Sequence, residues 1–418
     1  MKLNNAQRAW ALYDPGNAAY ALIVRTVFAP FFFKYCVADS FSDAESTSTW
    51  GIIASLSGIA AGIIAPGLGV FADSFRIKKY LLAFFVFTGV MSTALLGFTD
   101  RGAVTSVITL SFISLGSYMI ANSFYDSLLI DVAPRGKRDE LSSWAYAWGY
   151  VGGIVPFIIC LAVVKVAGMN DILAASRFAF IFSGVWWTAL TLPMLRQVRE
   201  RRRHPDDREK LYWGAAFRRV FANRNVMIFL IAYFLYIDGV GTIYLLATPI
   251  AQDIGISTSL IMFTVLGLQF LAFPCTIAYG RLSRRVAVRR LIWMAIGVYM
   301  VIALLAGLLP LLPSYREKLV VFLILAALIG SSQGGIQALS RSLYSRLIPA
   351  KNAAEFFGVY NLFGKFTTIM GPLLVGLSTW MWGRAEYGIM MLVFLFGSGA
   401  LLLGKVEIPA TAGGGGKE

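Results

Sequence analysis

Long apolar segments alternate with short polar loops along the whole chain. Each segment has about 20 residues or more, the length that an α-helix needs to cross the hydrocarbon core of a bilayer. So many segments in series are too numerous for the buried helices of a soluble protein. The pattern predicts twelve transmembrane spans, at residues 10–37, 50–72, 79–99, 103–131, 142–168, 174–195, 225–251, 258–280, 288–310, 318–345, 355–381 and 386–404.

The chain also repeats itself at an offset of 215 residues. Each copy runs from an apolar segment through a short basic loop into a second apolar segment. The matched residues are Pro134 with Pro349, Glu140 with Glu355, Gly149 with Gly364, Ser127-Leu128 with Ser342-Leu343, and Asn122 with Gln337. Two copies in the same orientation indicate two halves related by an axis along the membrane normal, which is the plan of one large class of secondary transporters.

We therefore predict an all-α integral membrane protein, with twelve transmembrane helices in two six-helix bundles. The first bundle covers residues 1–195, a cytoplasmic linker 196–223, and the second bundle 224–405. The Gly-rich tail, 406–418, is expected to be disordered.

Composition supports a membrane location. Of the 418 residues, 58% are hydrophobic and 14% charged, whereas soluble domains average about 25% charged residues. Most of the 37 Lys and Arg fall in the termini and in alternate loops, with the largest group between Arg196 and Arg224. This asymmetry predicts that both termini are cytoplasmic, in a bacterial inner membrane. The basic residues lie in short loops beside spans, which argues against nucleic-acid binding.

Several kinds of chemistry lack the residues they need. The start, MKLNNAQRAW, lacks the ordered regions of a cleavable signal peptide, so we expect the first span to remain. Three scattered cysteines and the single His204 give no metal-site spacing and no histidine relay in the membrane. A nucleotide-binding Gly-x-x-x-x-Gly-Lys-Ser/Thr motif is absent, as is an Asp-x-x-Asp loop for a lipid-modifying enzyme. We predict no enzyme activity and no cofactor or metal, and we expect a monomer whose partners are a small solute and the bilayer.

Ionisable residues inside the spans are the first site candidates. A charge near the bilayer centre costs about 2.5–3.5 kcal/mol, and charges retained there usually face a cavity or the bundle interior. Arg25, Asp238 and Lys365 lie near the middles of the first, seventh and eleventh spans. Asp126 lies toward the end of the fourth span, and its repeat mate is Arg341. Those two could pair across the halves, or each could form a local contact.

The loop after the second span carries a recognisable pattern. It reads Gly69-Val-Phe-Ala-Asp73-Ser-Phe-Arg76-Ile-Lys-Lys79. It resembles the Gly-x-x-x-Asp-Arg-x-Gly-Arg-Arg/Lys signature of the major facilitator superfamily, with Ser74 in place of the first Arg and the second Gly missing. The resemblance implies a latch between cytoplasmic helix ends, formed by Asp73, Arg76 and Lys79. We expect Asp131 to bond the Arg76 region, and Arg341 to take part in gating.

A narrower resemblance covers nearly the whole chain. Five segments in order are similar to the autophagy-related vacuolar effluxer family and its bacterial relatives: WALYDPGNAAYA at 10–21, NSFYDSLLIDVAP at 122–134, AYFLYIDGV at 232–240, QALSRSLYSRLIP at 337–349, and AEFFGVYNLFGKF at 354–366 with GPLL at 371–374. The resemblance implies the twelve-helix facilitator fold and transport of small solutes, with amino acids the class named for the vacuolar members. Arg25 and Asp126 depart from the residues that the family often has there.

In the facilitator fold, spans one, four, seven and ten line the central cavity and spans two, five, eight and eleven flank it. We therefore expect substrate contacts from Arg25, Asp238, Lys365, Asn17, Tyr20, Asn122, Tyr125, Tyr236, Gln269, Gln333 and Gln337. Hydrogen bonds between helices are the competing use of the uncharged members. Asp238 and Asp126 are the candidate proton carriers, because burial raises the pKa of a carboxylate and a nearby cation lowers it.

These observations predict a secondary active transporter that works by alternating access. The solute is expected to be small and polar, and anionic or amino-acid-like, with transport coupled to protons. The alternative is a lipid or lysolipid flippase on the same fold, whose mark would be a lateral and largely apolar groove.

Overall fold

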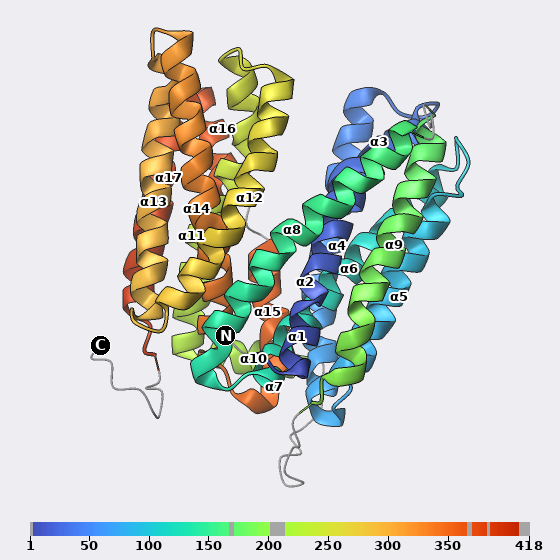
Figure 1. Cartoon of the computed structure of the whole chain (residues 1–418), viewed down its shortest axis with the longest axis vertical. Helices are drawn as coiled ribbons and strands as arrows, with labels where there is room; N and C mark the ends of the chain where they lie inside the picture. The colour runs from blue at the N-terminus through green and yellow to red at the C-terminus, as the bar shows by residue number, and fades with distance from the viewer. Residues whose placement is uncertain (1–2, 167–170, 201–213, 366–369, 383–384, 409–418) are drawn as a thin grey trace. The chain divides into compact units, whose positions relative to one another are not determined.

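A computed structural model describes residues 3–166, 171–200, 214–365, 370–382 and 385–408. These residues form helices and connecting turns, and none of them lies in a strand. The predicted all-α membrane fold is confirmed (Figure 1). Residues 409–418, most of the tail predicted to be disordered, lie outside the described ranges.

Among its described residues, the first half of the chain forms nine α-helices and one π-helical segment. They are α1 (Asn5–Ala11), α2 (Tyr13–Tyr20), a π-helical segment (Ala21–Phe28), α3 (Ala29–Val37), α4 (Asp43–Phe75), α5 (Lys78–Leu96), α6 (Val104–Ser127), α7 (Leu129–Val132), α8 (Arg138–Val166) and α9 (Ile172–Gln197). The first predicted span thus consists of four successive pieces. Its π-helical part contains Arg25, and π-helical turns are rare and frequent at functional sites.

In the part that the structure describes, the second half forms eight α-helices. They are α10 (Ala215–Ala222), α11 (Arg224–Asp253), α12 (Thr258–Leu282), α13 (Val288–Leu308), α14 (Tyr315–Leu347), α15 (Ala353–Lys365), α16 (Met370–Trp382) and α17 (Ala385–Gly404). Short 3₁₀ turns at Arg135–Lys137, Leu309–Leu311 and Ala350–Asn352 connect some of these elements.

Eleven helical runs among the described residues are long and apolar enough to cross a membrane. The remaining predicted span, 355–381, corresponds to α15 and α16, and residues 366–369 between them lie outside the described ranges. Eleven runs and this pair account for the twelve predicted spans.

The described residues form two compact units. Unit 1 comprises 1–134, 148–218 and 349–362, and unit 2 comprises 135–147, 219–348 and 363–418. In unit 1, α5 packs on α6 and α9, α4 on α6, and α2 on α9. In unit 2, α12 packs on α14, α13 on α14 and α17, and α11 on α17.

The two units exchange short segments. The predicted division assigns 135–147 to the first bundle and 349–362 to the second, but the structure groups each with the other unit. Glycines permit this close packing. A Cβ on Gly69 of α4 would lie 2.5 Å from the backbone nitrogen of Glu355, and one on Gly280 of α12 would lie 2.6 Å from the Cβ of Ser143. Both sequence halves therefore contribute to each unit.

Candidate functional site

In unit 1, one face of the first span carries a polar and aromatic cluster. Asn17 of α2 is partly exposed, and its Oδ1 atom is buried without a hydrogen-bond partner among the described residues. The hydroxyl of Tyr118 on α6 lies within hydrogen-bonding reach of Asn17 and Asn122. The partly exposed Arg25 is close enough for its charge to act on that hydroxyl. A guanidinium, two amides and a phenol thus lie together.

Aromatic rings form the wall behind this cluster. The Tyr125 ring stacks on Trp10 and Tyr13, with centroids 4.6 and 4.3 Å away. The indole of Trp10 donates a hydrogen bond of 3.0 Å to the Tyr125 carbonyl. Trp187 of α9 packs against Tyr20, with centroids 4.5 Å apart. These five residues are at most 1% exposed, so the wall is a packed core.

Three of the predicted substrate contacts are buried side chains. Tyr20 is fully buried, and its hydroxyl is hydrogen-bonded to Thr93, at 2.7 Å, and to Ser114. Tyr125 lies in the stacked wall. In unit 2 the fully buried Tyr236 hydroxyl is 2.6 Å from Ser340 Oγ on α14. Each of these tyrosines packs in the interior of its unit, where hydrogen bonds between helices and ring stacking occupy it.

Asp238 of α11 is also fully buried, in unit 2. Its Oδ2 atom accepts a hydrogen bond of 2.5 Å from the backbone N–H of Gly371 on α16. A Cβ on Gly371 would lie 1.9 Å from Thr242 Oγ1 and 3.0 Å from Asp238 Oδ2, so only glycine fits this approach. The side chain of Lys365, predicted to balance Asp238, lies outside the described residues.

Amide side chains mark a second polar cluster in unit 2. Gln333 and Gln337 of α14 and Gln269 of α12 are all partly exposed. The Oε1 atoms of Gln269 and Gln333 are buried without a hydrogen-bond partner among the described residues. These oxygens can accept hydrogen bonds from a polar solute.

Asp126 and its repeat mate Arg341 each make local contacts. Asp126 accepts a hydrogen bond of 3.0 Å from the Asn361 amide in unit 1. In unit 2, Arg341 donates to Ser142 Oγ at 2.9 Å and lies over the Tyr146 ring, 4.3 Å from its centroid. The 215-residue offset relates Asn361 to Tyr146, so the two contacts are pseudo-equivalent.

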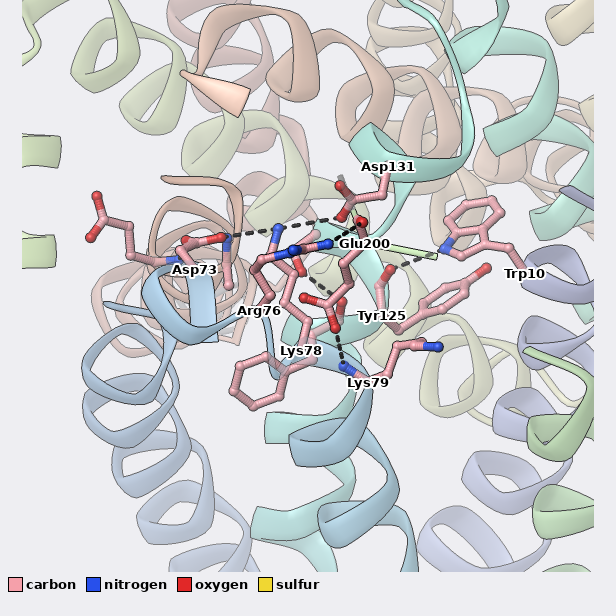
Figure 2. Close-up of polar contacts among 12 residues, drawn as sticks. Trp10, Asp73, Arg76, Lys78, Lys79, Tyr125, Asp131 and Glu200 are labelled. Carbon is pink, nitrogen blue, oxygen red and sulfur yellow. Dashed lines mark hydrogen bonds and ion pairs between the residues drawn. The ribbon is translucent and has the colours of Figure 1, made fainter. Parts of the chain in front are cut away.

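The loop between α4 and α5 forms a buried charge network in unit 1 (Figure 2). Oδ2 of Asp73 accepts the backbone N–H groups of Ala354, at 2.8 Å, and Glu355, at 3.1 Å. Oδ1 of the same carboxylate is 3.0 Å from Lys78 Nζ, which is also 3.3 Å from Asp131 Oδ2. A carboxylate at the first turn of α15 complements the amide groups and dipole of that helix.

This network corrects the predicted partners of Asp73. Lys78 pairs with Asp73 and with Asp131, whereas Lys79 donates through its backbone N–H to Glu200 Oε1 at 3.1 Å. Arg76 caps α4 in the left-handed conformation, with φ of 61°, and its guanidinium donates to the Glu200 carbonyl at 3.3 Å. Arg76 occupies the place of the signature's second glycine, which explains the left-handed backbone.

Glu200 is the residue of this network that the sequence analysis missed. It follows α9 and receives hydrogen bonds from the α4–α5 turn. Burial raises the pKa of its carboxyl. Hydrogen bonds from the backbone N–H groups of Lys79 and Lys78 lower that pKa in part. A lone acid in a basic loop carries no sequence signal that would reveal such a contact.

Unit 2 has its own network at the start of α8. Asp139 accepts Ser342 Oγ at 2.6 Å and is ion-paired with Arg346 on α14. Glu140 is ion-paired with Arg284, which follows α12, and the Arg284 side chain is 58% exposed. The network in unit 1 is buried, whereas the Glu140–Arg284 pair lies at the surface.

Comparison with solved structures shows the class of protein. The chain resembles the proton:xylose symporter XylE, with a TM-score of 0.74 at 13% identity over 96% of this chain and 95% of that one. It also resembles the human organic anion transporter MFSD10, with a TM-score of 0.72 at 13% identity over 96% and 99% of the two chains. The protein is a multi-pass integral membrane protein with the major facilitator fold.

Sequence comparison shows the family. The model described as "Vacuole effluxer Atg22 like" matches residues 131–411, and the chain belongs to this family of the major facilitator superfamily. It is 36% identical over 417 residues to the uncharacterized MFS-type transporter YxiO of Bacillus subtilis, covering 97% of this chain and 95% of YxiO. It is 25% identical over 407 residues to autophagy-related protein 22 of Saccharomyces cerevisiae, covering 81% and 74% of the two.

Proposed function

We propose that this secondary transporter moves a small polar solute that carries a carboxylate, such as an amino acid or organic acid, by alternating access. The observation that carries the proposal is Arg25, a guanidinium kept inside a membrane span and partly exposed. Its planar donors fit a carboxylate in two-point contact. The amides of Asn17 and Asn122 add polar contacts within the same unit.

The amides of unit 2 support the same proposal. Gln269, Gln333 and Gln337 accept and donate hydrogen bonds without the cost of burying a charge. We propose that the clusters of unit 1 and unit 2 each bind the solute during the transport cycle. The charge asymmetry favours a bacterial inner membrane with cytoplasmic termini.

The test is uptake and binding of carboxylate solutes by the purified protein in liposomes. Arg25→Ala should weaken binding by about tenfold or more, because a charge-assisted hydrogen bond contributes roughly 1.5–3 kcal/mol. Arg25→Lys should restore only part of it, because lysine lacks the two-point geometry. Arg101→Ala is the matched control, since that exposed arginine pairs with Asp39 outside the cluster. Normal carboxylate transport by Arg25→Ala would show that Arg25 is structural.

We further propose that Asp238 or Asp126 carries a coupled proton. Asp238→Asn should flatten the pH dependence of flux, because asparagine cannot titrate. Gly371→Ala is the matched control, because it crowds the same contact and leaves the carboxyl in place. It should slow flux without changing the shape of the pH profile. Equal pH profiles for wild type, Asp238→Asn and Asp126→Asn would exclude both carriers.

A further inference from the structure

Unit 2 contains an apolar cavity that the proposed transport site does not use. The cavity measures about 70 Å³ and is enclosed by α11, α12, α13, α14 and α17. Its lining is almost entirely aliphatic, with Leu268, Ile302 and Leu325 among the contributors. An apolar cavity of this kind stays dry and takes up apolar groups. A polar solute is therefore not its occupant.

A shallow groove of about 330 Å³ adjoins this cavity between α12 and α14. Thr264, Leu268 and Ala326 line both spaces, so only these side chains separate them. The small residues Gly267 and Ala327 belong to the groove as well. The groove faces outward from unit 2, because Phe263 and Leu323 are 70% and 44% exposed. Its side chains are almost all apolar, so the groove suits an acyl chain better than a polar solute.

One stripe of α14 connects the groove to a basic residue. Arg316, Val320, Leu323 and Ala327 follow at spacings of four, three and four residues, which places them on one helix face. All four are exposed. Arg316 and Val320 line a further groove, at the first turns of α14. Arg316 and Ala327 are about 16 Å apart along the axis, which is half of a hydrocarbon core about 30 Å thick.

We propose that unit 2 binds one membrane phospholipid, with an acyl chain in the α12–α14 groove and its phosphate on Arg316. The length of the stripe matches one leaflet, and the charge of Arg316 complements a phosphate, to which a guanidinium donates paired hydrogen bonds. The adjoining cavity gives the chain end or a branch an apolar space to enter.

The bound lipid is a resident molecule and not cargo. On α14 the lining of the cavity and groove ends at Ile329, although the helix continues to Leu347. The later part of α14 carries buried polar residues such as Ser340 and Arg341. The apolar surface therefore covers one leaflet only, whereas a lipid carried across the membrane would need a path through both.

Native mass spectrometry of the full chain with added phosphatidylglycerol tests the proposal. Gly267→Leu fills the groove, and Gly297→Leu on α13 is its matched control, because a Cβ on either glycine would meet no atom within 4 Å. Arg316→Gln removes the cation, and Lys318→Gln is its control on the same turn. The fraction of protein retaining one lipid should fall about tenfold in Gly267→Leu and Arg316→Gln. Both controls should retain it.

Three results would overturn the proposal. The first is equal retention by all four variants, which would indicate unselective annular lipid. The second is equal retention of phosphatidylglycerol by Arg316→Gln and wild type, which would show that Arg316 does not bind the phosphate. The third is a dimer in wild type that Gly267→Leu abolishes, which would make the groove an interface between copies. Monoolein, which lacks a phosphate, should bind wild type and Arg316→Gln equally if Arg316 recognises phosphate.

Discussion

Individual residues of the α4–α5 turn show why a degenerate motif still forms its contacts. Ser74 replaces the first arginine of the signature, and Arg76 replaces its second glycine. Asp73 nevertheless accepts hydrogen bonds from the backbone amides of α15 and forms an ion pair with Lys78. The sequence identified Asp73, but the choice of Lys78 over Lys79 as its partner required knowledge of the turn. The left-handed residue at 76 directs Lys78 toward Asp73, and the neighbouring position, Lys79, donates its backbone N–H to Glu200.

A pair of substitutions at Arg76 separates backbone strain from the side-chain contact. Arg76→Gly and Arg76→Ala both remove the bond to the Glu200 carbonyl. Only glycine adopts a φ of 61° without cost, so Arg76→Gly should be the more stable variant by about 1 kcal/mol. Thermal unfolding in detergent measures the difference. Equal stabilities would mean that the turn relaxes when the side chain is shortened.

At the scale of elements, each unit binds the start of a helix from the other sequence half. The interactions that bind it differ between the two units. Unit 1 uses a buried carboxylate on backbone amides at the start of α15, whereas unit 2 pairs Glu140 of α8 with an exposed arginine. The repeat predicted equivalent positions, because Glu140 matches Glu355. It could not predict that the two contacts differ, since the partners Asp73, in the last turn of α4, and Arg284, after α12, lie in segments of unlike sequence.

The two contacts should therefore respond differently to salt. Glu140→Gln should slow transport at low ionic strength and have little effect near 1 M salt, where the screening length is about 3 Å. Asp73→Asn should slow transport at both ionic strengths, because its contacts are buried, and should weaken solute binding less than it slows flux. Proteoliposome flux and binding at the two ionic strengths provide the measurement. Loss of the Asp73→Asn effect at high salt would contradict the buried network.

At the scale of the whole molecule, hydropathy and the repeat predicted the spans and the two halves. They did not predict the first span's π-helical segment or the exchange of 135–147 and 349–362. Hydropathy records that a segment is apolar, but it does not record which neighbour buries it. The same limit applies to the candidate site. Tyr20 and Tyr236 fall on plausible faces, yet hydroxyl partners on other helices bury them.

Charge placement predicts the orientation of the chain, and accessible single cysteines test it. Ser40→Cys should react with a membrane-impermeant maleimide in intact cells, and Gly136→Cys should react only after permeabilisation. Both positions are exposed, whereas the native Cys36 and Cys160 are buried. Wild type supplies the background from the partly exposed Cys275. If Gly136→Cys is labelled in intact cells, the orientation of the chain is opposite to the predicted one.

The exchange of segments also bears on how such a chain could arise by gene duplication. A half-length ancestor folded alone would leave the place of residues 349–362 empty, and the equivalent of Asp73 would lose its amide donors. Two identical ancestral chains in the same orientation would supply that segment to each other. Neither sequence half by itself therefore contains all the residues of one compact unit.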